Sequence, residues 1–133
     1  MSDFKPANGK WFTRAFASKT GTLYEVGDPI YNDGTNNIAV VSTSDKALGI
    51  CAQAKLAATA DTSDLLMWVP DNAATFEAPV TTGAIAKDDE GQSFDFTDKD
   101  GVDATGTTEN VVRLVKFLTT TKGIFTFDTG KNT

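Results

Sequence analysis

Residues 23–54 constrain the fold more than any other stretch, because short apolar runs alternate there with clusters of turn-forming residues. The apolar or β-branched runs are 29–31, 38–41 and 48–51. The sequence Asn32-Asp33-Gly34 and the polar run 42–46 separate them, and both have the chemistry of tight turns. The pattern predicts a β-meander of three strands. It predicts a scaffold, and it carries no catalytic motif.

The remaining chain also favours strands. A chain of 133 residues is the right size for one domain with a buried core, and its 9 Phe residues and many Thr residues are typical of β-structure. We therefore expect an all-β protein with one short helix. The predicted organisation is an N-terminal arm without fixed structure over residues 1–9, one β-rich domain over 10–128 and a polar tail over 129–133.

Alternation of apolar and polar residues predicts further strands outside the meander. In the first of them, Phe12, Arg14 and Phe16 share one face. Pro79 indicates that its strand lies at an edge or ends there. Gly49 marks a bulge or a close approach of another backbone. The predicted strands are 10–18, 65–69, 75–80 and 93–97.

Two segments need separate interpretation. Residues 82–92 are the candidate for the short helix, with Thr82 as N-cap and Gly91 at the left-handed position after its end. Residues 110–119 carry apolar side chains at helical spacing, which leaves a helix open. Their β-branched content and the turn that leads into 124–128 favour a β-hairpin.

The sequence lacks the residues that most catalytic and metal sites require. It contains no histidine, which removes Ser-His and Cys-His nucleophile systems and the commonest zinc ligand. With one cysteine it can form neither an internal disulfide nor a thiolate metal cage, and Cys51 lies in an apolar run where we expect a buried, inert thiol. No glycine-rich phosphate loop occurs. We expect no enzyme activity, no cofactor and no metal site.

Two weaker patterns have ordinary explanations. Asp98, Asp100 and Asp103 lie in an acidic, glycine-punctuated segment, but an EF-hand register would put Phe96 and Thr107 where carboxylates are needed. A solvated loop is the simpler interpretation, with a weak cation site as the alternative. Lys116 stands in an apolar run, where it either reaches out from the sheet edge or faces a neighbouring chain.

Charge is distributed unevenly along the chain. The net charge is −6, which makes nucleic acid an unfavourable partner. The first 22 residues carry four basic residues and one acidic residue, a net charge of +3, which leaves −9 for the remainder. Aromatic residues are concentrated in the same basic segment. We interpret it as an arm that docks on a partner.

Membrane and secretion signals are not expected. No apolar run approaches the length needed to cross a bilayer, and the first ten residues have no apolar segment of the kind found in secretory signals. The sequence thus predicts a protein made and folded in the cytoplasm of the producing cell.

In the order of these features the chain resembles the capsid decoration, or cement, proteins of tailed bacteriophages. The resemblance covers residues 10–128 and is carried by five stretches in order. They are KWFTRAFA, EVGDPIYNDG, DKALGI, FEAPVTTGAIAKDDEGQSFDF and VKFLTTTKGIFTF. It implies a small β-barrel or tulip-like domain with an extended N-terminal arm, no active site, and a place on the outer surface of the virion.

The resemblance also implies partners. These are the major capsid protein, whose neighbouring subunits the domain would bridge, and further copies of this chain, with a trimer favoured. The arm would supply the capsid-binding residues, which are Phe4, Lys5, Lys10, Trp11, Phe12 and Arg14. The alternative for Trp11, Phe12 and the nearby Phe16 is that they fill the domain's own core.

Other classes of function stay open. A carbohydrate-binding or adhesin-like module would use Trp68 or Trp11 as a platform for sugars. Another virion part, such as a tail tube or head-fibre subunit, would self-assemble into rings or fibres. An enzyme ranks last, since the sequence offers no catalytic constellation.

Overall fold

The computed structural model describes residues 4–18, 22–32, 34, 37–39, 45–54, 64–71 and 73–127, with the backbone alone for 37–39 and 64. Residues 1–3 of the predicted arm, the middle of the turn at Asp33, most of the turn at 42–46 and the tail 129–133 lie outside the described residues.

The described chain is almost entirely β-structure, which confirms the predicted all-β class. Alternating side chains account for most of the strands, since successive residues of a strand point to opposite faces of a sheet. The strands are β1 Lys5–Asn8, β2 Trp11–Ala17, β3 Pro29–Asn32, β4 Asn37–Ala39, β5 Gly49–Cys51, β6 Asp64–Pro70, β7 Thr75–Thr82, β8 Ser93–Asp98, β9 Gly101–Asp103, β10 Val112–Thr119 and β11 Lys122–Phe127.

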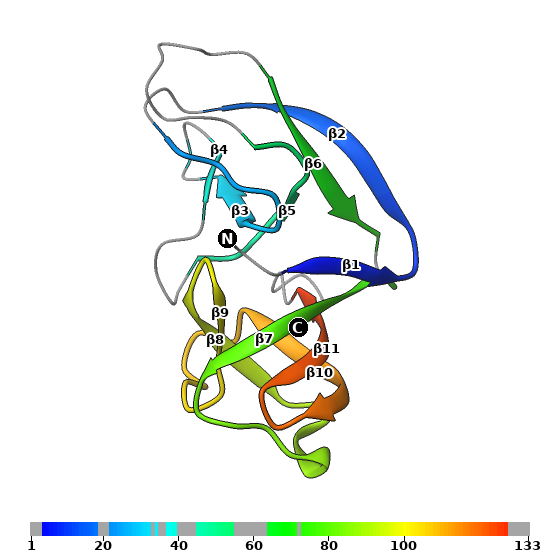
Figure 1. Ribbon diagram of the computed structural model, residues 1–133, viewed down its shortest axis with the longest axis vertical. Coiled ribbons are helices and arrows are strands. Elements are labelled where there is room, and N and C mark those ends of the chain that lie inside the picture. The colour runs from blue at the N-terminus through cyan, green and yellow to red at the C-terminus, as the bar shows by residue number, and fades with distance from the viewer. Residues whose placement is uncertain are drawn as a thin grey trace.

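Five strands close into a small barrel, as the expected fold class required. Their order is β7-β11-β10-β8-β9, and a parallel pairing of β9 with β7 completes the ring (Figure 1). β1 adds to β7 on the outside of this ring. Phe76, Phe96 and Phe125 alternate inward from three of the strands and are fully buried. Closure removes free sheet edges within the barrel.

The other strands form a second sheet in the order β2-β6-β5-β3-β4. Three of its strands come from the predicted meander, but β3 lies between β4 and β5. The third strand therefore returns to the far side of the first, and the meander prediction is wrong in its strand order. Gly49 confirms the predicted close approach, because a Cβ there would lie 2.4 Å from the carbonyl oxygen of Trp68.

The two sheets share one hydrophobic core. Ile50 from β5 is fully buried among the inward side chains of the barrel, and Trp68 packs against the same cluster. A smaller cluster lies on the other face of the second sheet, around Tyr24, Leu65 and Met67. Shared burial joins the barrel and the second sheet into a single folded body.

The predicted unstructured arm is wrong for the residues that the structure describes. Lys5–Asn8 forms β1, which pairs antiparallel with β7, and Gly9 turns the chain into β2 with a φ of 81°. The Phe4 side chain is 1% exposed. Pairing and burial of this kind are tertiary interactions, and local sequence periodicity does not reveal them.

The predicted short helix over residues 82–92 is mostly irregular chain. β7 runs through Thr82, and only Lys87–Asp89 forms a 3₁₀ turn, here called η1. The carboxylate of Asp89 accepts a hydrogen bond from the Ala86 amide at 2.8 Å. Gly91 has the predicted left-handed conformation, with a φ of 96°. The Ile85 amide donates to the carbonyl of Thr120 at 2.9 Å, so a tertiary hydrogen bond overrides the helix propensity of the alanines on either side.

Pro79 lies inside the sheet, although it was predicted at an edge or an end. The neighbouring Val80 donates its amide to the carbonyl of Thr121, on the β11 side of β7. Successive amides alternate sides, so the Pro79 nitrogen faces the opposite side. There the pairing with β1 stops at Glu77 and the pairing with β9 starts at Val80. Proline is tolerated at this break in the ladder.

The predicted hairpin over 110–128 is confirmed as β10 and β11. Its register shifts twice, between Leu114 and Lys116 and between Phe117 and Thr119. Val115 and Leu118 are the extra residues at these bulges, and they are 45% and 36% exposed. Each bulge resets the alternation of side chains, which explains why the apolar residues mimic helical spacing.

The segment predicted as an acidic loop contains β9, which closes the barrel. Asp95 organises the chain that follows it. Its Oδ1 accepts hydrogen bonds from the amides of Glu109 and Asn110 at 2.8 and 2.9 Å, and Asn110 has a φ of 54°. This carboxylate is buried, and sequence reasoning assigned it no role.

Candidate functional site

β2 is the most exposed strand of the second sheet among those whose side chains the structure describes. All seven of its residues pair in register with β6, from Trp11 opposite Pro70 to Ala17 opposite Asp64. It has no other neighbour among the described strands, and it forms the outer margin of the second sheet (Figure 1). Only Trp11 and Phe16 are half-buried, and the other side chains are exposed. Within the described part of the chain, the strand therefore presents an open edge.

Phe12 and Arg14 form an ordered pair on this strand. They lie two residues apart and share a face, as predicted, and the Arg14 guanidinium carbon lies 5.2 Å from the centre of the Phe12 ring. This cation–π contact holds an aromatic ring and a positive charge side by side. Phe12 remains 40% exposed, which is unusual for a phenylalanine within a sheet.

The structure divides the predicted capsid-binding residues into two groups. Phe4 is buried in the core, so in this structure its side chain is not placed to insert into a pocket of the capsid in the way expected from the sequence. Trp11 is half-buried against the same core, and its indole N–H donates to the carbonyl oxygen of Thr75 at 3.1 Å. The side chains of Lys5, Lys10, Phe12 and Arg14 are exposed. Only these four lie on the surface.

The exposed residues do not gather at one point. Phe12 and Arg14 form the pair on β2. Lys10 precedes that strand, and its carbonyl accepts a hydrogen bond from the Asp71 amide at 3.0 Å. Lys5 is on β1, where it lines a different feature. The basic segment therefore presents two separate surfaces.

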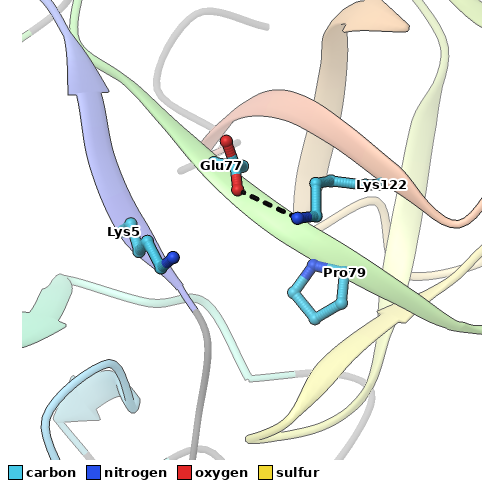
Figure 2. A pocket seen from close by; sticks show the side chains of 4 residues that line it. All are labelled: Lys5, Glu77, Pro79 and Lys122. Carbon is cyan, nitrogen blue, oxygen red and sulfur yellow. Dashed lines mark ion pairs between the residues drawn. The ribbon is translucent and has the colours of Figure 1, made fainter. Parts of the chain in front are cut away.

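A shallow hollow of about 220 Å³ lies beside Lys5, bounded by Glu77, Pro79 and Lys122 (Figure 2). Its residues come from β1, β7 and β11. Lys122 Nζ lies 3.5 Å from Glu77 Oε2. Sequence reasoning missed this site, because no local pattern brings together residues 5, 77 and 122. The only sequence feature that pointed to this place was Pro79, a proline within a predicted strand.

Lys99, in the acidic segment around Asp98 and Asp100, forms ion pairs with several carboxylates. Lys99 Nζ lies 3.2 Å from both Glu25 and Asp100, and 3.9 Å from buried Asp28. Burial of Lys99 disfavours its charge, but the hydrogen bonds to Glu25 and Asp100 outweigh that effect, and the pKa of Lys99 is raised. Among the described residues, no group of three or more carboxylate or cysteine side chains is placed to hold a metal ion.

Cys51 is fully buried, as predicted, and its Sγ lies 3.0 Å from the carbonyl oxygen of Gln53. Burial raises the pKa of the Cys51 thiol to about 11. Lys116 is exposed on β10, in agreement with a side chain that reaches out from the sheet. Trp68, considered above as a sugar platform, is half-buried against the core, as is Trp11.

In the described part of the chain, no helix is long and apolar enough to cross a membrane. Comparisons of the chain with protein-family models, with curated proteins and with solved structures found no match.

Proposed function

We propose that this protein is a non-enzymatic virion component that binds the outer surface of an assembled phage capsid and stabilises it by bridging capsid subunits. The order of sequence features supports this proposal through its resemblance to decoration proteins. The compact barrel is a suitable scaffold for such a role. A net charge of −9 over residues 23–133 favours a location away from packaged nucleic acid.

The open edge of β2 is the observation that carries the proposal. An exposed edge strand can accept a strand from another protein through main-chain hydrogen bonds, with side chains adding specificity. The exposed ring of Phe12 offers an apolar contact beside that edge. Attachment to the major capsid protein would then use Lys10, Phe12 and Arg14.

Arg14 argues against pairing of this edge with itself. It is the central residue of the seven-residue strand β2. If two copies paired antiparallel about the strand centre, each Arg14 would face the other, and like charges directly opposite destabilise a strand pair. The edge is therefore better suited to a different protein. A homo-oligomer, with a trimer favoured by the resemblance, would form through another surface, and its size can be measured by sedimentation equilibrium.

Binding to expanded heads that lack this protein tests the proposal. We expect Phe12→Ala and Arg14→Glu each to weaken binding by about tenfold or more, because a few side chains carry most of the binding free energy of a protein interface. Lys116→Glu makes the same charge change on exposed β10 and is expected to bind normally. Full occupancy by both β2 variants would contradict the proposed attachment. Failure of the unaltered protein to bind heads would contradict the proposed function.

A further inference from the structure

The hollow beside Lys5 lies on the outer face of the barrel, where three strands place their side chains together. Lys5 faces Glu77 across the β1–β7 pair, and Pro79 faces Lys122 across the β7–β11 pair. Directly opposed residues of antiparallel strands point to the same face. The adjacent residues of β7, Phe76 and Ala78, are fully buried in the core. All four lining residues are therefore held on one surface by strand register.

Pro79 forms the floor of the hollow, at a break in the hydrogen-bond ladder of β7. Along this side of β7 the partner strand changes from β1 to β9 between Glu77 and Val80. Pro79 lies in the break and has no amide to offer. Its ring, which Figure 2 shows beside the lysine and glutamate side chains, gives the hollow an apolar surface.

The charges around the hollow do not balance. Lys122 is paired with Glu77, whose carboxylate lies 3.5 Å away. Lys5 takes part in no ion pair within the described residues, although it is directly opposite Glu77 in register. Figure 2 shows its ammonium directed toward the hollow. Two ammonium groups and one carboxylate leave one positive charge uncompensated at the rim.

We infer that this hollow, here called the Lys5 socket, binds the carboxylate of a glutamate or aspartate side chain on a protein partner. The carboxylate would lie between Lys5 and Lys122, and the aliphatic stem would contact the Pro79 ring. An apolar floor with a cationic rim suits a carboxylate on a short hydrocarbon chain better than a bare oxyanion. The assignment to a protein partner rests on the proposed capsid attachment, whereas the socket itself does not.

Titration of the isolated protein with small anions tests the socket directly. Butyrate reproduces a glutamate side chain, acetate lacks its stem, and inorganic phosphate is a bare oxyanion. Amide chemical shifts of β1, β7 and β11 report binding. We expect saturation by butyrate on the order of 10 mM, and weaker binding of acetate and phosphate. No saturable shift with butyrate overturns the socket, and tighter binding of phosphate or acetate overturns the assigned ligand.

Charge variants sharpen the result. Lys5→Gln is expected to weaken butyrate binding about threefold to fivefold, and Glu77→Gln to strengthen it by a similar factor because a repelling charge is removed. Lys116→Gln removes the same charge from an exposed position on β10 that does not line the hollow, and should bind like the unaltered protein. Equal weakening by Lys5→Gln and Lys116→Gln would show a nonspecific charge effect and overturn the socket.

Binding of Lys5→Gln to heads tests the protein partner separately. A loss of affinity there, together with retained binding of Lys116→Gln, supports a partner carboxylate in the socket. Normal head binding by Lys5→Gln overturns the capsid as the source of that carboxylate. Butyrate binding in solution is measured without heads, so failure of the capsid proposal is distinguishable from failure of the socket.

Discussion

The ring of Phe4 lies 5.5 Å from the ring of Phe76, and this contact ties the start of the described chain to the centre of the barrel. Phe4 also contacts Phe96 at 5.8 Å, and its amide donates to the carbonyl of Gly27, which leads into the second sheet. One residue thus joins β7, β8 and the chain before β3. Residues near the N-terminus are an integral part of the domain.

Truncation of Phe4 should therefore destabilise the protein strongly. We expect Phe4→Ala to lower the free energy of unfolding by about 3–5 kcal/mol, through lost burial and a cavity between aromatic rings. Phe12→Ala is the matched control, because Phe12 is exposed, and its effect should stay below about 1 kcal/mol. Urea denaturation measures both. Equal effects would contradict the division of these residues between core and surface.

Gly49 should tolerate no side chain. In Gly49→Ala the new methyl group would meet the Trp68 carbonyl oxygen, and backbone atoms cannot rotate away. We expect a loss of about 1–3 kcal/mol in the free energy of unfolding. Gly34→Asn is the contrasting variant, because nothing lies within 4 Å of a Cβ added at Gly34 and only its φ of 99° opposes the change, so the loss there should be smaller. Thermal melts that show the same loss for both would refute the close approach.

The buried thiol of Cys51 predicts a loss of stability in alkali. Its pKa is raised from 9.0 to about 11, mainly by burial, so the folded state keeps the proton while the unfolded state releases it. The free energy of unfolding should fall between pH 9 and pH 11, by on the order of 2 kcal/mol relative to Cys51→Ala, which has no thiol to titrate. Denaturant titrations across this range measure the difference. Parallel pH profiles would disprove the assignment.

The Glu90 side chain hydrogen-bonds to the edge of β10 where that strand no longer pairs with β8. β10 pairs with β8 only at Val112 and Arg113, and beyond them the Phe117 amide donates to Glu90 Oε2 at 2.8 Å. This hydrogen bond and one from Lys87 lower the pKa of Glu90 below its ordinary 4.5. The contact is therefore present above that range and is lost as the pH falls through the lowered pKa.

The amide chemical shift of Phe117 reports this titration. We expect a midpoint below pH 4.5 in the unaltered protein and no such titration in Glu90→Gln. The variant should also exchange the Phe117 amide hydrogen faster, because a neutral side chain is a weaker acceptor. A midpoint at or above 4.5 would mean that the carboxylate does not hold this edge.

Local patterns in the sequence predicted the strands well, because a strand with one buried face must alternate its side chains. The bounds of β6, β8 and the β10–β11 hairpin follow from such runs, and Gly49 was identified as a position of close approach. Failures arose where tertiary pairing overrides local preference. The alanines after Thr82 do not form the helix that their propensity favours, since the chain there bonds through the Ile85 amide to the carbonyl of Thr120.

The surface sites depended on pairing even more. The alternation of Phe12 and Arg14 was visible in the sequence, and so was the basic, aromatic character of the first segment. The sequence did not reveal that Phe4 lies in the core and Phe12 on the surface, because both are phenylalanines in similar local sequence surroundings. The Lys5 socket combines residues 5, 77, 79 and 122, which only strand order brings together.

The sequence by itself therefore determined the all-β class, the hairpin of β10 and β11 and the contrast between a basic start and an acidic remainder. The tertiary structure alone decided which strands are neighbours, and through this which aromatic rings are buried and which side chains meet at the Lys5 socket. The physical reason is that alternation and turn chemistry act over a few residues, whereas strand pairing joins segments separated by tens of residues and is selected by the burial of the whole core.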